Sequence, residues 1–154
     1  MLSNFIKPNQ ILFGVNVKNK KSLFQELSIR SNLANKSIDQ KILFDKIIKR
    51  EKLGNTSISN GVAMPSALLD QINETFVLFS VLSKPIDYEA GDKIPVDLVC
   101  LVVSPSSSSS KHLYVLSNFS RLLKNEIISL RLRGCENSDA LFAVLLNFNL
   151  SSAA

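Results

Sequence analysis

Apolar residues recur every three or four positions in a segment near the N-terminus, which is the spacing of one face of an α-helix. The residues on this face are Leu23, Phe24, Leu27 and Leu33. At the start of the segment, Ser22 and Gln25 have the spacing of a capping box, in which both side chains bond free backbone N–H groups. The pattern predicts a helix over residues 22–34.

A second helix is predicted shortly after the first. Ser37 and Gln40 repeat the capping-box spacing. The apolar positions that we expect to face the core are Phe44, Ile47 and Ile48. The charged positions that we expect to face solvent are Asp45, Lys46, Lys49 and Arg50.

The middle of the chain has the pattern of strands. Residues 54–61 are polar and rich in turn formers, and a short apolar run over 62–64 ends at Pro65. We expect two very short strands around a tight turn here, ending at an exposed position. Residues 75–82 and 94–103 are almost continuously apolar, which indicates strands buried on both faces of a sheet. We expect the segment between these two strands to be an irregular connection.

Another helix is predicted after the strands. Residues 104–110 are one proline and six serines, which we interpret as a polar loop. Ser109 or Ser110 is the expected N-cap of the helix that follows. The residues at helical spacing in that helix are Leu113, Leu116, Ser120 and Leu123.

A last helix is predicted near the C-terminus. Gly134 ends the short segment before it, and Asn137 or Ser138 is its expected start. The residues that we expect to face inward are Leu141, Val144, Leu145 and Phe148. Residues 151–154 are expected to form a frayed tail.

The order of these elements favours the α/β class. We expect a mixed sheet of about five strands, flanked by helices on both faces. The chain has 154 residues, which is the length of one domain and is enough to bury a core without disulfides or metal. We therefore assign residues 1–150 to a single domain.

Composition argues against several classes of protein. No apolar run approaches the roughly 20 residues that span a bilayer. Lys7 and Pro8 interrupt the segment where a signal peptide would be apolar, so we expect a cytoplasmic location. The two cysteines, Cys100 and Cys135, are far apart, and with a single histidine they give no zinc-ligand spacing. We expect neither a metal nor another cofactor.

The net charge of +5 is compatible with an acidic partner, nucleic acid among them, and also with a solvated surface that is merely basic. Most basic residues are spread out and no aromatic-basic motif is present, so nucleic acid is not the expected partner. The sequence also has no Gly-rich phosphate loop, paired carboxylates or Cys–His spacing that would identify a conventional enzyme site.

The most informative motif covers residues 49–66. It resembles the active-site signature of the enzyme IIA domains of the mannitol–fructose class in the bacterial phosphotransferase system, and most of all their nitrogen-regulatory member. The residues on the positions of this signature are Arg50, Glu51, Leu53, Gly54, Thr56, Ile58, Asn60, Gly61, Ala63 and Pro65. Segments 2–21, 85–88, 95–98 and 112–113 continue the resemblance, which implies the enzyme IIA fold for essentially the whole chain.

One departure from the family's pattern matters more than the matches. The family's phosphate acceptor is the histidine after the proline, and the residue at that position here is Ser66. A neutral imidazole, with a pKa near about 6.5, is nucleophilic at neutral pH, and its phosphoramidate passes phosphate onward. A serine hydroxyl needs an adjacent base, and its phosphoester is a poor donor. We therefore expect the phosphate relay to be lost.

The resemblance implies roles for further residues. His112 would hydrogen-bond the phosphoryl group or orient the acceptor, or else be a surface histidine that caps a helix. Arg50 would bind the phosphoryl group through its guanidinium, or else be a solvated residue at a helix end. The pocket and turn residues that the resemblance implies are Thr56, Asn60, Gly61 and Pro65. Thr56 and Asn60 would either hydrogen-bond across the turn and shape the pocket or stabilise the turn itself.

Three interpretations of Ser66 are open from sequence. In the first, transfer is lost and the surface still binds partners. In the second, Ser66 accepts phosphate from a kinase, or from a partner with His112 as base, and acts as a slow charge switch. In the third, the phosphate acceptor lies elsewhere in the chain.

We expect a nitrogen-regulatory-type enzyme IIA-like protein that acts by protein–protein interaction. The partners that the resemblance implies are an HPr-like phosphocarrier and regulatory targets such as kinases and transporters. The alternatives are a working phosphocarrier supplied by an HPr-type protein and, with less support, a basic nucleic-acid binder. Enzymatic phosphotransfer is uncertain from sequence because the acceptor histidine is absent.

Overall fold

Two long antiparallel strands form the centre of the computed structural model, which describes residues 4–153, with side chains through Asn147. They are β5 (Phe76–Ile86) and β6 (Val96–Pro105), paired with Leu78 opposite Leu101. The side chains of 76–82 and 98–105 are all buried, which confirms the prediction from their continuous apolarity. Strand β5 runs four residues beyond the predicted end, because Ile86 still pairs with Val96.

Four shorter strands complete a mixed sheet of six, one more than predicted. The strands are β1 (Ile11–Val15), β2 (Ser57–Ser59), β3 (Val62–Ala63) and β4 (Ser66–Leu69). Their order is β1-β5-β6-β3-β2, and β4 pairs with β6 beyond the end of β3. Strand β1 is parallel to β5, β3 and β4 are parallel to β6, and β2 is antiparallel to β3.

The sequence pattern did not reveal β4 because Pro65 marks the end of a strand in most contexts. Here Pro65 interrupts the ladder without ending it. Its carbonyl oxygen accepts a hydrogen bond from the Val102 N–H at 3.1 Å. Val62 pairs with Leu98 and Ser66 with Val102, so β4 continues the register of β3 along the same edge of β6.

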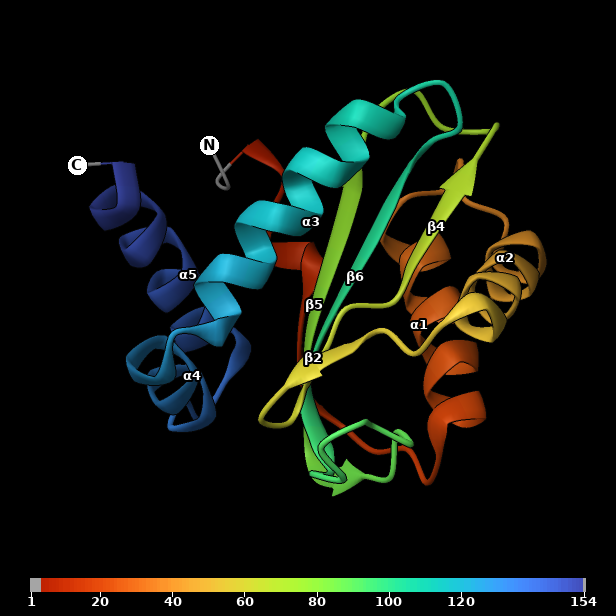
Figure 1. Cartoon of the computed structure of the whole chain (residues 1–154). Helices are drawn as coiled ribbons and strands as arrows, with labels where there is room; N and C mark the ends of the chain where they lie inside the picture. The colour runs from red at the N-terminus through yellow and green to blue at the C-terminus, as the bar shows by residue number, and fades with distance from the viewer. Residues whose placement is uncertain (1–3, 154) are drawn as a thin grey trace.

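Helices cover both faces of the sheet (Figure 1), which confirms the predicted α/β architecture. On one face lie α1 (Lys20–Ala34) and α2 (Gln40–Leu53). On the other lie α3 (Ser109–Lys124), α4 (Glu126–Arg133) and α5 (Ser138–Ala153). A short 3₁₀ helix, Pro8–Gln10, precedes β1. None of the helices in residues 4–153 combines the length and apolar composition needed to cross a membrane.

Each face of the sheet has its own hydrophobic core. Side chains from alternate positions of the central strands point to opposite faces, as the twofold period of a strand requires. Against α1 and α2 the buried residues include Leu23, Leu27, Leu43, Ile47, Leu78 and Leu101. Against α3, α4 and α5 they include Phe79, Val102, Val115, Phe119, Leu132 and Leu141.

The predicted N-caps of the first two helices were wrong by a few residues. Helix α1 begins earlier, because Asn19 is its N-cap and Ser22 is the third helical residue that bonds back to Asn19. Helix α2 is capped by Asp39, whose carboxylate accepts from the N–H groups of Lys41 and Ile42 at 3.0 Å. A capping box was therefore the right motif for α1, in a different register.

The predicted inward face of α3 was also wrong in part. Leu123 is buried as expected, but Leu113 is 66% exposed, and the core positions are Val115 and Phe119. The helix has Ser108 at its N-cap position without a side-chain hydrogen bond, instead of Ser109 or Ser110. The serine run gave no register for the helix because each of its residues is an equally good cap.

The predictions for the last helix agree with the structure where it is described. The Asn137 side chain accepts from the Ala140 N–H at 2.8 Å, and Leu141 and Leu145 are buried. The predicted position of Phe148 lies outside the described side chains. Helix α5 includes 151–153, which were predicted as a tail, and Ala154 is outside the described residues.

The two-residue turn between β2 and β3 has both residues in the left-handed region, with φ of 49° at Asn60 and 81° at Gly61. Positive φ at both positions is the geometry of a type I′ hairpin turn, for which Asn-Gly is the preferred sequence. The end of α4 holds the turn, because Arg133 Nη2 donates to the Asn60 carbonyl oxygen at 2.8 Å. Arg133 also forms an ion pair with Asp97 at 2.8 Å.

We predict that Gly61→Ala destabilises the fold by about 1–3 kcal/mol, because positive φ disfavours a side chain there. A Cβ at this position would also lie 2.8 Å from Arg133 Nη2 and 3.0 Å from the Pro95 carbonyl oxygen. Urea unfolding of the two proteins measures the difference. The control is Gly91→Ala, where a Cβ meets nothing within 4 Å. Equal stability of the two variants would contradict the account of this turn.

Candidate functional site

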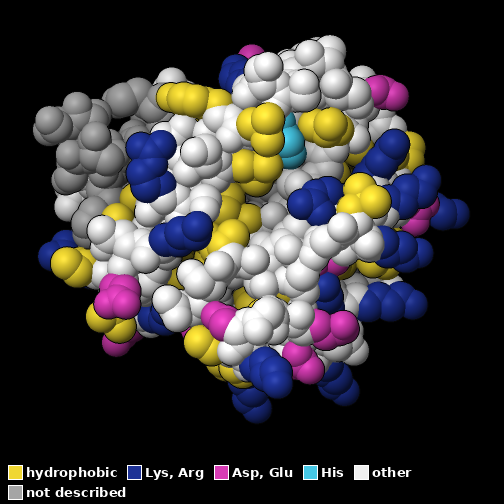
Figure 2. Space-filling model, in the orientation of Figure 1, with side chains coloured by type: hydrophobic (Ala, Val, Ile, Leu, Met, Phe, Trp, Pro, Cys, Tyr) yellow, Lys and Arg dark blue, Asp and Glu magenta, His cyan; other side chains and the backbone are white. Residues whose placement is uncertain are grey.

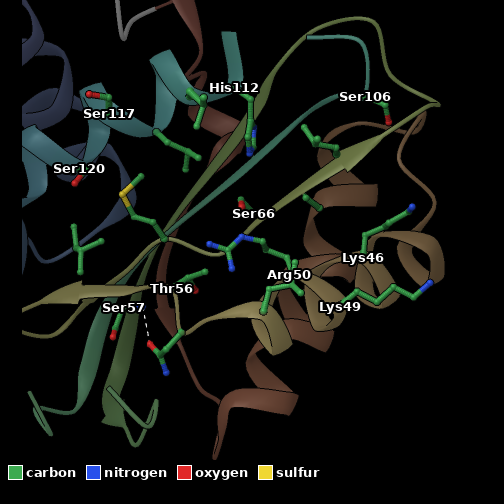
Figure 3. A pocket seen from close by; sticks show the side chains of 18 residues that line it. Lys46, Lys49, Arg50, Thr56, Ser57, Ser66, Ser106, His112, Ser117 and Ser120 are labelled. Carbon is green, nitrogen blue, oxygen red and sulfur yellow. Dashed lines mark hydrogen bonds between the residues drawn. The ribbon is translucent and has the colours of Figure 1, made fainter. Parts of the chain in front are cut away.

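A cleft of about 880 Å³ opens along the outer edge of β4, between α2 on one face of the sheet and α3 on the other. Its walls come from the C-terminal half of α2, from β2 and β4, and from the first three turns of α3 (Figure 3). Among its 18 lining residues are Arg50, Thr56, Ser66 and His112, four of the residues predicted from sequence. Segments that are far apart in the chain thus bring the main predicted site residues together.

Ser66 is the first residue of β4 and lines the centre of the cleft. It is only 5% exposed, so the expectation that the strand leads to an exposed position was wrong. The reason is that β4 continues the register of β3, which places Ser66 on the same face as Val62 and opposite Val102. No hydrogen bond joins the Ser66 hydroxyl to another of the lining side chains (Figure 3).

His112 lies in the first turn of α3 with its ring directed into the cleft, toward Ser66 (Figure 3). It is 8% exposed, which argues against the alternative of a surface histidine. Its Nδ1 is 2.7 Å from the hydroxyl of Ser104, which is in turn 3.0 Å from the hydroxyl of Thr75. This buried chain of hydroxyls fixes the orientation of the ring and leaves Nε2 as the nitrogen available to the cleft.

The charge state of His112 follows from its surroundings. Burial lowers the pKa of the imidazole below its ordinary value, and the positive charge of Arg50 lowers it further. The ring is therefore neutral at pH 7. A neutral ring can donate or accept one hydrogen bond at Nε2, according to which nitrogen carries the proton.

Arg50 lies in the last turn of α2, with its guanidinium directed into the cleft (Figure 3). Its Nη1 donates to the Gly54 carbonyl oxygen at 3.0 Å, so the side chain is anchored although it is exposed. Lys46 and Lys49 of the same helix also line the cleft. None of the lining residues is acidic, so the site favours an anion.

Thr56 lines the cleft, but its hydrogen bonds are made with residues of the protein interior. Its hydroxyl donates to Glu51 Oε1 at 2.5 Å and lies 2.7 Å from the Tyr88 hydroxyl. The Thr56 N–H donates to the other carboxylate oxygen of Glu51 at 2.9 Å, and Lys20 forms an ion pair with that oxygen at 2.8 Å. Of the two roles considered, these contacts favour stabilisation of the turn.

The other predicted turn residues lie outside the cleft lining. Asn60 and Gly61 form the far end of the hairpin, where the Asn60 N–H donates to Asp92 Oδ2 at 2.9 Å. Pro65 is buried between β3 and β4. These three residues position the strand that carries Ser66 and do not reach the space beside it.

Two groups of site residues were missed from sequence. Lys46 and Lys49 were expected to face solvent and were given no part in the site, but both line the cleft. Lys46 lies one helical turn before Arg50 and therefore shares its side of the helix. The contact of Ser104 with His112 had no signal, because the two residues lie on different elements and no fixed spacing links them.

Comparison with known proteins assigns the chain to a family. Residues 4–148 match the family described as phosphoenolpyruvate-dependent sugar phosphotransferase system, EIIA 2. This chain belongs to that family. The EIIA 2 assignment confirms the resemblance derived from residues 49–66.

Relatives of this EIIA 2 chain include proteins named nitrogen regulatory protein. The one from Bradyrhizobium diazoefficiens is 34% identical over 145 residues, which cover 94% of each chain. The one from Escherichia coli K12 is also 34% identical, over 122 residues that cover 77% of this chain and 75% of the relative.

Solved structures share the fold. The nitrogen regulatory protein IIA-Ntr of Neisseria meningitidis has a TM-score of 0.86 at 24% identity, covering 94% of this chain and 98% of that one. The mannitol IIA of Escherichia coli has a TM-score of 0.77 at 17% identity, covering 91% and 98%. A solution structure of that mannitol protein in complex with phosphorylated enzyme IIB also matches, with a TM-score of 0.77.

We predict that Arg50→Gln raises the pKa of His112, because it removes the nearby positive charge. The pKa stays below its ordinary value, since burial of the ring persists. An NMR titration of the single imidazole measures both values, and Arg30→Gln on α1 is the control, where the arginine pairs with Glu26. An unchanged pKa in Arg50→Gln would contradict the proximity of the two groups.

The same lowered pKa sets a pH dependence of stability. Because the folded chain binds the His112 proton less well than the unfolded chain, acid favours unfolding. The contribution of this group is complete above the unfolded pKa of about 6.5 and is lost as the pH falls from there through the folded-state pKa. Urea midpoints between pH 7.5 and 5 should decline less in His112→Gln than in the natural chain.

We predict that Thr56→Val costs about 1–3 kcal/mol of stability, because it leaves a buried oxygen of Glu51 without its closest donor. Tyr88→Phe is the comparison variant, and it should cost less, since the Tyr88 hydroxyl is 3.4 Å from the same oxygen. Urea unfolding of both variants gives the order. A larger loss for Tyr88→Phe would mean that Thr56 does not hold the carboxylate.

Proposed function

We propose that this chain is a nitrogen-regulatory-type enzyme IIA regulator that acts by binding other proteins and does not relay phosphate. Two observations support the proposal. Among the relatives that match along almost the whole chain are proteins named nitrogen regulatory protein. The residue at the centre of the cleft, beside Arg50 and His112, is Ser66, which lacks the nucleophilicity of an imidazole.

The observation that carries the loss of relay is the isolation of the Ser66 hydroxyl. A serine becomes a nucleophile when a base accepts its proton, through a hydrogen bond of about 2.6–3.2 Å. No such bond joins the Ser66 hydroxyl to His112 (Figure 3), whose Nδ1 contacts Ser104 and whose Nε2 is the nitrogen left for the cleft. A phosphoester formed here would in any case keep its phosphate, where a phosphohistidine would release it.

The surroundings of Ser66 retain the features of an anion site. Arg50 offers a guanidinium fork, and a neutral His112 offers one ring nitrogen. We propose that this part of the cleft receives a phosphoryl group presented by a partner without taking it over covalently. The partners of this scheme are an HPr-type phosphocarrier and regulatory targets such as kinases and transporters, met in the cytoplasm.

Phosphorylation with purified components tests the loss of relay. The chain is incubated with phosphoenolpyruvate, enzyme I and HPr, and its intact mass is measured before and after mild acid. We predict no acid-labile phosphate on the natural chain and one such phosphate on Ser66→His, because the remaining site is present. Ser106→His, at the rim of the same cleft, is the matched control and should stay unmodified.

Each other outcome has a definite meaning. Acid-labile phosphate on the natural chain would overturn the loss of relay. An acid-stable adduct on Ser66 would replace the proposal with a slow charge switch. A Ser66→His variant that stays inert while folded, as judged by its urea midpoint, would overturn the assignment of this cleft as the phosphoryl site.

A further inference from the structure

The rim of the cleft carries positive charges that the protein itself does not neutralise. Lys46 and Lys49 line one wall and are exposed. Within residues 4–153, neither takes part in a salt bridge, and no acidic side chain lines the cleft. Uncompensated charges at the edge of a concave site create a field that attracts an oppositely charged partner.

Basic residues also lie on α3, beyond the opposite wall of the cleft. Ser117 and Ser120 of α3 line the cleft, and Arg121 and Lys124 each follow one of them by four residues, one helical turn further along. Both are exposed. Lys and Arg side chains lie on both sides of the hollow in the space-filling view (Figure 2). The basic residues that line the cleft itself belong to α2, and those of α3 lie beyond its lining.

Aliphatic side chains lie between these charges. Leu53, at the end of α2, is 85% exposed, and Leu113, on α3, is 66% exposed. They stand on opposite walls, and the partly buried side chains that join them across the cleft are Ile58, Leu68 and Leu116. In Figure 2 hydrophobic side chains surround the single histidine. Single exposed leucines are common, but two that flank a concave apolar floor mark a contact surface.

The same lining distinguishes between two classes of polyanion. Proteins that bind single-stranded nucleic acid stack its bases on aromatic rings, and no Phe, Tyr or Trp lines this cleft. Aliphatic side chains contribute little to a phosphate backbone, whereas they pack well against Leu or Ile of a protein. The combination favours an acidic protein surface over nucleic acid.

We propose that this cleft docks a partner protein whose contacting surface is acidic and presents an aliphatic side chain between Leu53 and Leu113. The inference rests on the proposed function, since it describes the partner of the same site. Carboxylates of the partner face Lys46 and Lys49, and its aliphatic side chain displaces water from the floor of the cleft. The charges set the rate of association and its salt dependence, and the apolar contact sets the lifetime.

Peptide titrations of the isotope-labelled chain test the chemistry of the partner. The probe is an amphipathic helical peptide of about 16 residues with Glu on one face and Leu on the other. One matched peptide has Gln for Glu and another has Ser for Leu. We expect shift changes at Leu53, Leu113 and Lys49 with the first peptide, and at least about fivefold weaker binding of the other two.

Variants of the chain give the second measurement. Lys46→Ser with Lys49→Ser should weaken the acidic peptide at least about fivefold, and raising NaCl from about 50 to 300 mM should have a similar effect on the natural chain. The matched control is Lys41→Ser with Lys84→Ser, which removes the same charge from exposed positions outside the cleft. Urea midpoints verify that all variants are folded.

Three outcomes would overturn the proposal. One is the absence of shift changes at the cleft with about 1 mM acidic peptide. Another is equal binding of the Gln peptide, which would remove the charge argument. The third is tighter binding of a single-stranded DNA of about 16 nucleotides at the same residues, which would make nucleic acid the ligand. None of these results depends on phosphate transfer to Ser66, so failure here is distinguishable from failure of the proposed function.

Discussion

Strand β6 is buried on both faces, and this single constraint determines most of the site. A buried strand must hydrogen-bond its N–H and C=O groups along both edges, because water is not available to them. One edge is satisfied by β5. The other is satisfied in two pieces, β3 and β4, and the second piece carries Ser66 opposite Val102. The same strand carries Ser104 near its end, and Ser104 contacts His112, so both residues take their positions from one strand.

Two neighbouring charged residues at the end of α2 have different roles. Arg50 and Glu51 are neighbours in sequence, but consecutive residues of a helix point in directions about 100° apart. Glu51 turns inward and is neutralised by Lys20. Arg50 turns toward the cleft and keeps its charge for a ligand. The helix thus directs the opposite charges of Arg50 and Glu51 to different places. The Glu51 carboxylate therefore does not compete for Arg50 with an anion bound beside Ser66.

How much could be read from the sequence depended on whether the signal was local. The central strands and a tight turn near residues 54–61 were predicted because continuous apolarity and clustered turn formers act within a few residues. The residues of the cleft were found through a family signature, since no local pattern links Arg50 to His112. Strand β4 and the burial of Ser66 were missed because they follow from pairing with β6, which is remote in sequence. The contact of Ser104 with His112 depends on where a helix packs on a sheet, and the serine run before it carries no register.

The break at Pro65 has a consequence for how this segment can vary in length. Side chains alternate between the two faces of a strand. Because β4 continues the register of β3 across Met64 and Pro65, the number of residues between the two strands decides which face Ser66 occupies. An insertion or deletion of one residue here would exchange Ser66 with a neighbour such as Ala67, which belongs to the core beneath α1 and α2. The cleft would then lose its central hydroxyl while the sheet kept its hydrogen bonds. An insertion or deletion of two residues would keep Ser66 on the cleft face. The segment between the hairpin and the cleft can therefore vary in composition more easily than it can change its length by an odd number of residues.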